Sequence, residues 1–398
     1  MSELSFFSTK LNGTITLPPY KSEAIRILLM SALSGVSPTA VVRLPDRLGD
    51  DLIAAKHAAE SLHALISNER NEPIYVNESA SLLRLLIPIS LAYSDKCEFI
   101  ISIRLWQRGL DEYVRALNCS LSFNQLSKTH GILTVTGIIK PMRYSVDVSR
   151  SSQFASGMLM MLPLVKGAAL SLPYVNGNIE LVSKPYFDLT LELMKRFGIQ
   201  FEADHLKDSV VLSASGKYSF PGNIRLSGDG SYAANYIVAN SFGSDVKFSN
   251  YPDFMQSDTV IDSIIHHDVI DISDCPDLFP ILCIAACGRN GLTVIKNTAR
   301  LSTKESDRVF SMQAGIASLG GNICVAENSV RIFGNGHLSC GTVNSFNDHR
   351  IVMAFAIASL IADGPIRIIN ADAVAKSAPS FFDDFVSLGG VIIEDYFC

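Results

Sequence analysis

The sequence predicts an α/β protein assembled from repeated helix–turn–strand segments. Six times along the chain, apolar residues at helical spacing lead through a short turn into a β-rich run. These endings recur roughly every 65 residues, which indicates an internal repeat. At 398 residues the chain is also long enough for about two domains of ordinary size. The endings are 58–66 into 74–76, 113–117 into 121–123, 191–197 into 199–202, 260–265 into 269–272, 312–319 into 323–325, and 385–388 into 391–393.

The turns and the remaining segments fit the same class. Gly or Asn often stands at the turn, where it can end a helix in the left-handed conformation. Residues 4–17 are typical of extended chain, which ends at Pro18-Pro19. We expect a helix from about Ser22 through Leu33, ending at Ser34-Gly35. The longest apolar run, Ile351–Ala362, is too short to cross a bilayer and predicts a buried helix.

A charged Ser-Thr-Lys-Glu-Ser-Asp-Arg stretch precedes one of the apolar-periodic helices. Its Ser302 and Glu305 have the capping-box spacing that opens a helix. On such a helix Lys304 and Arg308 would lie four residues apart and share a face. Because a helix N-terminus adds partial positive charge and free N–H groups, this face suits a multiply charged anion. A well-capped, solvated helix start explains the stretch equally well.

The overall charge argues against several kinds of partner. A formal net charge of −6 and a pI near 5.8 disfavour binding to nucleic acid or to a membrane through a polybasic surface. Cations gathered into motifs on an acidic chain therefore indicate a local anion site. The first ten residues lack the basic start and the long apolar run of a signal peptide, so we expect a cytoplasmic protein.

The cysteines predict neither a disulfide framework nor a metal site. The eight of them are scattered, no Cys-x-x-Cys pair occurs, and His266-His267 has no nearby ligand set. Cys283 and Cys287 lie four apart in an apolar run, which favours a buried helix. We expect reduced, mostly buried thiols and no structural metal.

Five motifs carry a resemblance to one enzyme family. Together they resemble the signatures of the 5-enolpyruvylshikimate-3-phosphate (EPSP) synthases, the enolpyruvyl transferases of aromatic amino-acid synthesis. The matches follow the family's order and, together with the stretch around Lys376, span residues 18–379. One such motif is a weak signal, whereas five in order over nearly the whole chain are a strong one. They are Pro18-Pro19-Tyr20-Lys21-Ser22 with Arg26, Ser151-Ser152-Gln153, Leu181–Tyr186, Lys304–Arg308 and Asn347–Arg350.

The resemblance implies a two-domain enolpyruvyl transferase fold of the α/β (α+β) class, with six βαβαββ repeats, three per domain. One domain would be residues 20–227 and the other residues 1–19 with 228–398, with hinges near 18–20 and 226–228. The implied reaction transfers the enolpyruvyl group of phosphoenolpyruvate to the 5-hydroxyl of shikimate 3-phosphate and releases phosphate, without metal or cofactor. We expect a monomer whose two halves both contribute to binding these anions and close on them.

The family's functional residues transfer onto matching positions of this chain. Phosphoenolpyruvate would be held through its phosphate by Lys21, Arg108 and Gln153, and through its carboxylate by Arg308, Arg350 and Lys376. Shikimate 3-phosphate would be held by Ser22, Arg26, Ser151, Ser152, Gln153, Ser183, Asp277 and Lys304. The match implies that Asp277 accepts the hydroxyl proton. It also implies that Glu305 and Lys21 transfer a proton at the methylene carbon.

One segment departs from the family pattern. Residues 77–84 stand where the family has Gly-Asn-x-Gly-Thr-x-x-Arg. Glu78 places a carboxylate beside the expected anion site, which is unfavourable unless it points away or pairs with Arg84. Ala80 replaces the second glycine, where the backbone approaches the phosphate. We therefore expect its methyl group to weaken glyphosate, the inhibitor that competes for this pocket in the family.

Two other functions are compatible with the motifs. A UDP-N-acetylglucosamine enolpyruvyl transferase performs related chemistry, but it uses a reactive cysteine before its Arg-Pro pair, and residues 100–107 contain none. A non-catalytic, anion-binding paralogue would keep the cleft without turnover, and the altered segment at 77–84 favours it.

Overall fold

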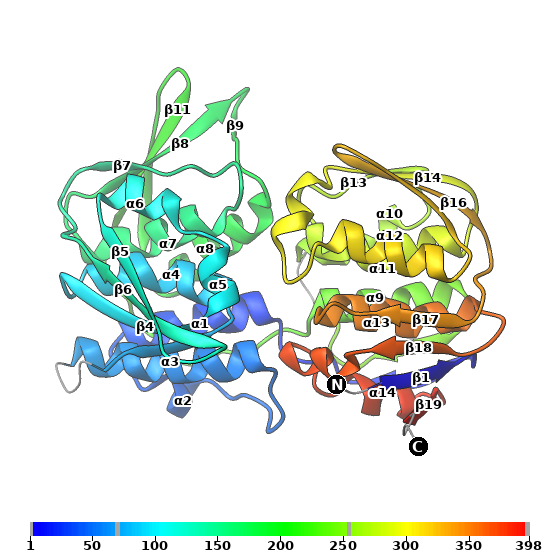
Figure 1. The fold of residues 1–398 in the computed structure, drawn as a ribbon. Coiled ribbons are helices and arrows are strands. Elements are labelled where there is room, and N and C mark those ends of the chain that lie inside the picture. Colours follow the sequence, from blue (N-terminus) through cyan, green and yellow to red (C-terminus); the bar gives the residue numbers. More distant parts are fainter. Residues whose placement is uncertain (1–2, 68–71, 253–255, 395–398) are drawn as a thin grey trace. The chain divides into compact units, whose positions relative to one another are not determined.

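The structure, a computed structural model, describes residues 3–67, 72–252 and 256–394 (Figure 1). Its backbone contacts divide the chain into two compact units. The N-terminal unit comprises Lys21–Leu44 and Asp50–Leu226. The C-terminal unit comprises the residues up to Tyr20, Pro45–Gly49 and the residues from Ser227 onward. The assignment of three repeats to each domain stays a prediction.

The N-terminal unit alternates helices and strands throughout. Its helices are α1 (Lys21–Leu33), α2 (Pro38–Val41), α3 (Asp50–Ile66), α4 (Ala80–Leu91), α5 (Ile103–Gln107), α6 (Asp111–Leu117), α7 (Gln153–Met161), the short 3-10 helix η1 (Leu162–Leu164) and α8 (Lys184–Arg196). Its strands are β3 (Ile74–Asn77), β4 (Lys96–Ser102), β5 (Ser120–Gln125), β6 (His130–Thr136), β7 (Arg143–Ser145), β8 (Ala169–Val175), β9 (Asn178–Ile179), β10 (Gln200–His205) and β11 (Ser209–Ser215).

The C-terminal unit follows the same alternation. Its helices are α9 (Gly230–Ser241), η2 (Ser257–Val260), α10 (Ile261–Ile264), η3 (Pro276–Leu278), α11 (Phe279–Cys287), η4 (Ala299–Thr303), α12 (Arg308–Ser318), α13 (His349–Ala358), η5 (Ser359–Ile361), η6 (Ala371–Lys376) and α14 (Phe381–Ser387). Its strands are β1 (Glu3–Phe7), β2 (Asn12–Ile15), β12 (Asp245–Phe248), β13 (Val269–Asp271), β14 (Asn290–Lys296), β15 (Asn322–Ala326), β16 (Ser329–Asn335), β17 (Gly341–Asn344), β18 (Ile366–Ile369) and β19 (Val391–Glu394).

Among the described residues, four sheets share one strand order. In each, a parallel pair is followed by two strands in antiparallel pairing: β3-β4-β6-β5, β7-β8-β11-β10, β13-β14-β16-β15 and β17-β18-β1-β19. In the last sheet the third position is taken by β1, from the start of the chain, whereas β6, β11 and β16 take it in the other three sheets. A further ladder pairs β2 with β12 in parallel. This recurring order agrees with the repeat architecture expected from the sequence.

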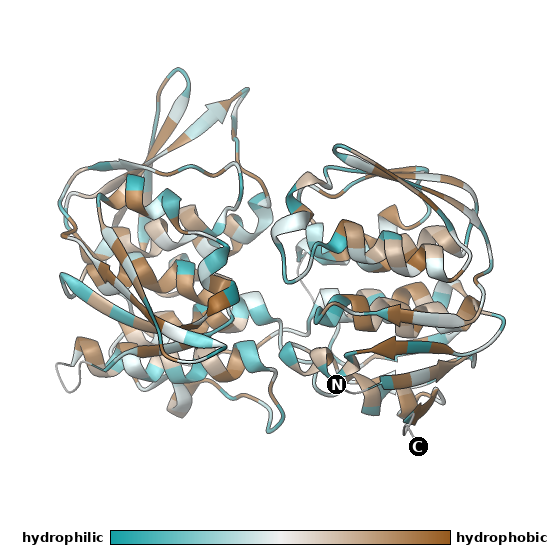
Figure 2. Cartoon of the chain, in the orientation of Figure 1, coloured by the Kyte–Doolittle hydropathy of each residue, from teal (hydrophilic) through white to brown (hydrophobic). Residues whose placement is uncertain are grey.

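Buried helices connect the parallel strands. Parallel neighbours need a crossover connection, and α4, α7, α11 and α13 supply it. These helices are buried along almost their whole length, and their residues are mostly apolar, coloured brown in Figure 2. In the C-terminal unit α9, α11 and α13 pack against one another, between the sheet of β13–β16 and the sheet of β17, β18 and β1 (Figure 1). In the N-terminal unit α4 packs on α7, and α7 on α8.

The predicted helix–turn–strand endings are present. The helices at these endings lead into β3, β5, β10, β13, β15 and β19. Asn118 adopts the left-handed conformation with φ 49°, and Gly198, Gly320 and Gly389 have positive φ as well, which satisfies the helix ends as the turn residues predict. The buried helix expected near Ile351 is α13, and Cys283 and Cys287 are buried in α11. Within the described residues, no helix combines the length and apolarity that crossing a membrane requires.

Candidate active site

Arg308 lies at the centre of a charged cluster in the C-terminal unit. Its side chain is 1% exposed, and each of its three nitrogens contacts a different carboxylate. Nη1 donates to Asp277 and Nη2 to Glu305, both at 2.8 Å, and Nε donates to Asp348 at 2.9 Å. Burial lowers the pKa of Arg308, but the three carboxylates outweigh burial and raise it. A guanidinium carries five N–H groups, so one N–H on each Nη remains for a ligand.

Asp277 gathers three cations around one carboxylate. Besides Arg308, its Oδ2 accepts a hydrogen bond from Arg350 Nη2 at 2.9 Å, and its Oδ1 lies 3.5 Å from Lys304 Nζ. Burial raises the pKa of Asp277, but Arg350, Lys304 and Arg308 together bring it well below its ordinary value. Asp277 is therefore ionised at neutral pH and is a weak proton acceptor in the empty cluster.

Two aspartates that cap helices build this cluster from local sequence. Asp307 caps α12, because its Oδ1 accepts a hydrogen bond from the backbone N–H of Phe310 at 3.0 Å. Asp348 caps α13 by accepting from the backbone N–H of Arg350 at 2.9 Å, while its other oxygen binds Arg308. Carboxylates are favourable at helix N-termini. In the Asn-Asp-His-Arg motif, Asp348 thus both begins α13 and orients Arg308.

The predicted capping box of Ser302 and Glu305 is wrong. Residues 299–303 form the short helix η4, in which Ser302 donates a hydrogen bond to the carbonyl of Ala299. Asp307 begins α12 instead, because it stands immediately before the apolar run, and Glu305 contacts Arg308. Lys304 precedes the helix, so the prediction that it shares a helical face with Arg308 is also wrong. The two cations meet at the carboxylate of Asp277.

The structure thus brings five of the expected residues of this unit into one network: Asp277, Lys304, Glu305, Arg308 and Arg350. The sixth, Lys376, ends η6 and is 9% exposed. No group of three or more His, Cys, Asp or Glu side chains suited to a metal ion occurs in the described part of the chain.

In the N-terminal unit, α1 carries three expected residues. Arg26 is 2% exposed and donates from Nε to Thr190 Oγ1 at 2.8 Å, from Nη1 to the carbonyl of Ser22 at 2.8 Å, and from Nη2 to the carbonyl of Tyr186 at 3.1 Å. Because Tyr186 and Thr190 belong to α8, Arg26 fastens α1 to that helix. Lys21 pairs with the carboxylate of Asp51 on α3 at 2.9 Å.

The expected hydroxyl-bearing residues meet where α7 and α8 begin. Ser152 Oγ donates a hydrogen bond to the carbonyl of Ser183 at 3.1 Å, and Ser151 Oγ accepts one from the backbone N–H of Gln153 at 3.3 Å. Ser183 directly precedes α8 and adopts the left-handed conformation with φ 53°. Two helix N-termini therefore lie beside this group of hydroxyls, an arrangement that suits an anion.

Arg84 is the central cation of a second cluster. It is 8% exposed, its Nη1 donates to Gln153 Oε1 at 2.8 Å, and its guanidinium carbon lies 4.6 Å from the ring centroid of Phe154. Its Nε has no hydrogen-bond partner among the described residues. Burial lowers the pKa of Arg84 to about 10, and the charge of Arg108 adds to this effect, whereas Glu112 opposes it.

Sequence reasoning missed two residues of this second cluster, Glu112 and Arg150. Glu112 is 1% exposed and accepts a hydrogen bond from Arg150 Nη1 at 3.1 Å. Arg150 Nη2 donates to the backbone carbonyl of Arg108 at 3.4 Å. Arg108, one of the residues expected to hold the phosphate of phosphoenolpyruvate, directly follows α5. We call Arg84, Arg108 and Arg150 the three-arginine cluster. Glu112 gives no sequence signal beyond its charge, which a surface residue shares.

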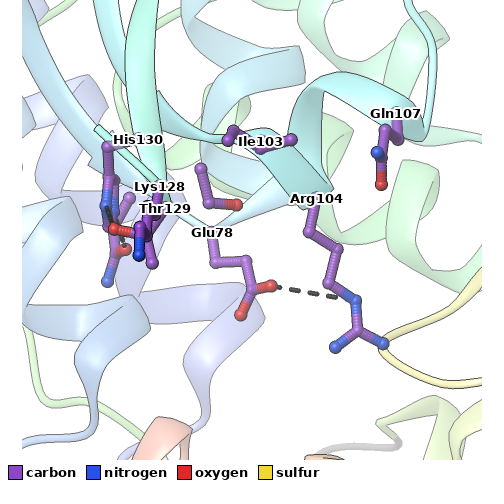
Figure 3. A pocket seen from close by; sticks show the side chains of 9 residues that line it. Glu78, Ile103, Arg104, Gln107, Lys128, Thr129 and His130 are labelled. Atoms are coloured by element: carbon purple, nitrogen blue, oxygen red, sulfur yellow. Dashed lines mark hydrogen bonds and ion pairs between the residues drawn. The ribbon is translucent and has the colours of Figure 1, made fainter. Parts of the chain in front are cut away.

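A pocket of about 540 Å³ opens beside α5 in the same unit. In Figure 3 Glu78 and Arg104 face one another there, with 3.9 Å between Oε1 and Nε. Opposite them, His130 Nε2 lies within hydrogen-bond distance, 3.0 Å, of Asn77 Oδ1. Glu78 therefore pairs with Arg104. The lining comprises Asn77, Glu78, Ser102, Ile103, Arg104, Gln107, Lys128, Thr129 and His130.

Asp258 is a further buried acid that sequence reasoning missed. It is 1% exposed and accepts hydrogen bonds from the hydroxyls of Ser231 and Ser257. Burial raises its pKa to about 6, the charge of Asp277 adds to the rise, and Arg350 opposes it. Its segment has no apolar periodicity, so no pattern distinguishes Asp258 from an exposed loop aspartate.

Solved structures of two enolpyruvyl transferases share this fold. An EPSP synthase from Acinetobacter baumannii matches with a TM-score of 0.74 and 20% identity, covering 100% of both chains. The enolpyruvyl transferase NikO from Streptomyces tendae matches with a TM-score of 0.71 and 13% identity, again over 100% of both chains. At these identities the likeness establishes the two-domain α/β fold alone.

Sequence relatives then identify the family. The family model described as EPSP synthase (3-phosphoshikimate 1-carboxyvinyltransferase) matches residues 125–267 and 255–385. Curated proteins named 3-phosphoshikimate 1-carboxyvinyltransferase are 34% identical in Clostridium novyi (strain NT) and 33% identical in Clostridioides difficile (strain 630), each over 99% of both chains. This chain belongs to the EPSP synthase family, and the resemblance drawn from its motifs is confirmed.

Proposed function

We propose that this chain transfers the enolpyruvyl group of phosphoenolpyruvate to the 5-hydroxyl of shikimate 3-phosphate and releases phosphate. The Arg308 cluster is the single observation that carries the proposal beyond family membership. In it a buried guanidinium keeps one N–H on each Nη for a ligand while it orients two carboxylates, Asp277 and Glu305. Such a cluster can bind a carboxylate substrate and present acid–base groups beside it.

In the C-terminal unit, the carboxylate of phosphoenolpyruvate would bind to Arg308, Arg350 and Lys376. A bound anion shares the positive charge that now stabilises ionised Asp277, so the pKa of Asp277 rises when substrate arrives. Asp277 then becomes a better acceptor for the proton of the attacking hydroxyl. Lys304, which already contacts Asp277, would bind shikimate 3-phosphate.

In the N-terminal unit, Lys21, Arg108 and Gln153 would hold the phosphate of phosphoenolpyruvate. Gln153 accepts from Arg84 through Oε1, which leaves its amide N–H groups to donate to an anion. Shikimate 3-phosphate would bind to Ser22, Ser151, Ser152, Gln153 and Ser183. Arg26 would act on the same ligand by fixing the start of α1, because three of its N–H groups bind protein oxygens.

The proton balance gives Glu305 and Lys21 their proposed task. When the 5-hydroxyl attacks the enol carbon, the methylene carbon gains a proton from an acid and the hydroxyl loses its proton to a base. The product again contains a methylene group, so the methyl group of the intermediate must lose one proton to a base as phosphate departs. Glu305 is held by Arg308 at 2.8 Å and Lys21 by Asp51 at 2.9 Å. Both groups are thus oriented, as proton transfer at a fixed atom requires.

A product assay tests the proposal directly. Phosphate release would be measured with phosphoenolpyruvate and shikimate 3-phosphate together, with each alone, and with UDP-N-acetylglucosamine as the acceptor. We expect release only with shikimate 3-phosphate. Release with the UDP-sugar would indicate the other transferase, and binding of both anions without release would indicate a non-catalytic paralogue.

The proposal also requires both units to act on the same substrates. We expect the chain to close on its ligands, because neither set of cations alone neutralises two phosphates and two carboxylates. Small-angle scattering should show a smaller radius of gyration with saturating shikimate 3-phosphate, and an unchanged radius would count against closure. A monomeric state and a cytoplasmic location complete the proposal, and size-exclusion chromatography with light scattering tests the first of these.

A further inference from the structure

Glu112 is a buried acid to which the proposed transfer chemistry assigns no task. Its side chain is 1% exposed, Oε1 accepts a hydrogen bond from Arg150, and Oε2 has no hydrogen-bond partner among the described residues. A buried carboxylate with one oxygen unsatisfied is costly. Its surroundings must therefore offset that cost.

The three-arginine cluster supplies this compensation. Arg150 contacts Glu112 at 3.1 Å and the carbonyl of Arg108 at 3.4 Å. Burial lowers the pKa of Arg84, and the charges of Arg108 and Arg150 lower it further, whereas the charge of Glu112 raises it. The neighbouring Tyr113 fastens α6 to the cluster, because its hydroxyl donates to the carbonyl of Arg84. Glu112 thus pairs with Arg150 and acts on the charge of Arg84, although no substrate-binding role explains this acid.

We propose that Glu112 is the internal counter-anion of the three-arginine cluster, which stabilises the cluster when it is empty and weakens its hold on phosphate. The inference rests on the proposed function, in which Arg108 and Gln153 hold the phosphate that the reaction releases. A cluster of uncompensated arginines would bind this product tightly and release it slowly. A fixed negative charge beside it keeps phosphate exchangeable, so Glu112 sets the phosphate affinity without contacting phosphate.

Two substitutions separate the charge of Glu112 from its hydrogen bond. Glu112→Gln keeps the shape and an acceptor for Arg150 but removes the charge. Glu112→Asp keeps the charge but shortens the reach to Arg150. Titration calorimetry with inorganic phosphate would compare both with the parent. Glu112→Gln removes one negative charge from a partly buried cluster and should tighten phosphate binding by roughly tenfold. Glu112→Asp should bind phosphate as tightly as the parent does.

The same change should appear during turnover. We expect phosphate to inhibit Glu112→Gln at roughly tenfold lower concentration, with a lower KM for phosphoenolpyruvate, because a more positive subsite binds both anions more tightly. A merely structural role would raise that KM. The control is Glu98→Gln on β4, which loses the same charge from the partly exposed Lys96–Glu98 pair. Glu98 lies four residues along the strand from Ser102, where α5 begins, a span of about 13 Å.

Several outcomes would overturn the inference. Phosphate binding that is unchanged or weaker in Glu112→Gln shows that the charge does not set affinity. Altered binding in Glu112→Asp shows that the bond to Arg150 matters instead, and this variant decides the question if Glu112→Gln fails to fold. If the unmodified protein binds no phosphate at tens of millimolar, the proposed phosphate subsite does not exist. The product assay described above tests the transfer reaction independently of all three results.

Discussion

The two charged clusters of this chain are balanced in opposite ways. In the C-terminal unit, Asp277, Glu305 and Asp348 each contact a different nitrogen of Arg308. In the N-terminal unit, Glu112 pairs with Arg150, and the nearby Arg84 has its pKa lowered to about 10, first by burial and then by the charge of Arg108. In the first cluster one arginine contacts three carboxylates, whereas in the second the charges of Arg108 and Arg150 act on a buried arginine, Arg84. In the proposed function, the first cluster orients acid–base groups and the second binds phosphate.

Breaking the balance of the C-terminal cluster should have the largest effect. Arg308→Gln leaves three carboxylates facing one another in a buried site, and we expect a loss of about 3–5 kcal/mol in the free energy of unfolding, together with loss of turnover. Denaturant unfolding measures the stability. Arg289→Gln is the control, because its partner Asp268 is 79% exposed and such a pair contributes about 0–1 kcal/mol. Equal losses in the two variants would show that Arg308 is not the centre of the cluster.

Glu305→Gln should separate catalysis from stability in the same cluster. The amide can still accept the hydrogen bond from Arg308, and Asp307 rather than Glu305 caps α12. We therefore expect a normal melting temperature and a kcat lowered by about 10²–10⁴-fold, the usual contribution of an acid–base group. Asp307→Asn is the matched control, because Asn caps helices about as well as Asp. A Glu305→Gln variant that retains near-full kcat would leave Glu305 as an orienting partner of Arg308 only.

A smaller effect is expected in the N-terminal unit, where Ala80→Gly should change inhibition by glyphosate. Ala80 begins α4 and is 6% exposed, so its methyl group is packed. Steric overlap in a packed site costs about 1–3 kcal/mol, and we expect Ala80→Gly to increase glyphosate inhibition by roughly tenfold with little change in the KM for phosphoenolpyruvate. Inhibition of the parent, Ala80→Gly and Glu78→Asn would be measured side by side. If only Glu78→Asn increases inhibition, charge rather than the methyl group limits the inhibitor.

The smallest predicted effect concerns Asp258. The pKa of Asp277 in the same unit is lowered, whereas that of Asp258 is raised. Burial raises its pKa to about 6, above an ordinary value of about 3.9. The folded state therefore binds more protons than the unfolded state between about pH 4 and 6, so its stability falls as pH rises through that window. Asp258→Asn removes this cost, and its amide oxygen can still accept from Ser231.

We expect Asp258→Asn to raise the melting temperature at pH 7, by about 2–4 °C for each kcal/mol that it adds to the stability of a domain of 150–250 residues. Near pH 4 the difference from the parent should disappear, because both proteins are then neutral at this position. Melting curves at the two pH values measure it. A difference of the same size at both values would mean that packing, not ionisation, is responsible.

Local patterns in the sequence predicted much of the fold. The helix–turn–strand endings depend on neighbouring residues, and so does the left-handed turn at Asn118. The start of α12 was placed too early, because Ser302 and Glu305 have capping-box spacing, whereas Asp307, immediately before the apolar run, caps the helix. The partners of Arg308 come from three separate segments, and only folding brings Asp277 and Asp348 to it. Buried acids such as Glu112 and Asp258 look like surface residues in the sequence, because burial is a property of the assembled protein.

The place of β1 has a consequence for how the chain is made. Phe6 is fully buried, and its strand is paired with β18 and β19, where its partners are Ile366 and Ile392. At 5–20 residues per second, the ribosome needs roughly 20–70 s to reach β18 after β1 is made. During that time an apolar strand of the C-terminal unit has no partner, whereas almost all of the N-terminal unit is contiguous and complete by Leu226. Proteolysis of nascent chains stalled near residue 300 should cut the first ten residues and spare α4, and protection of both would show that another segment shields β1 until its sheet exists.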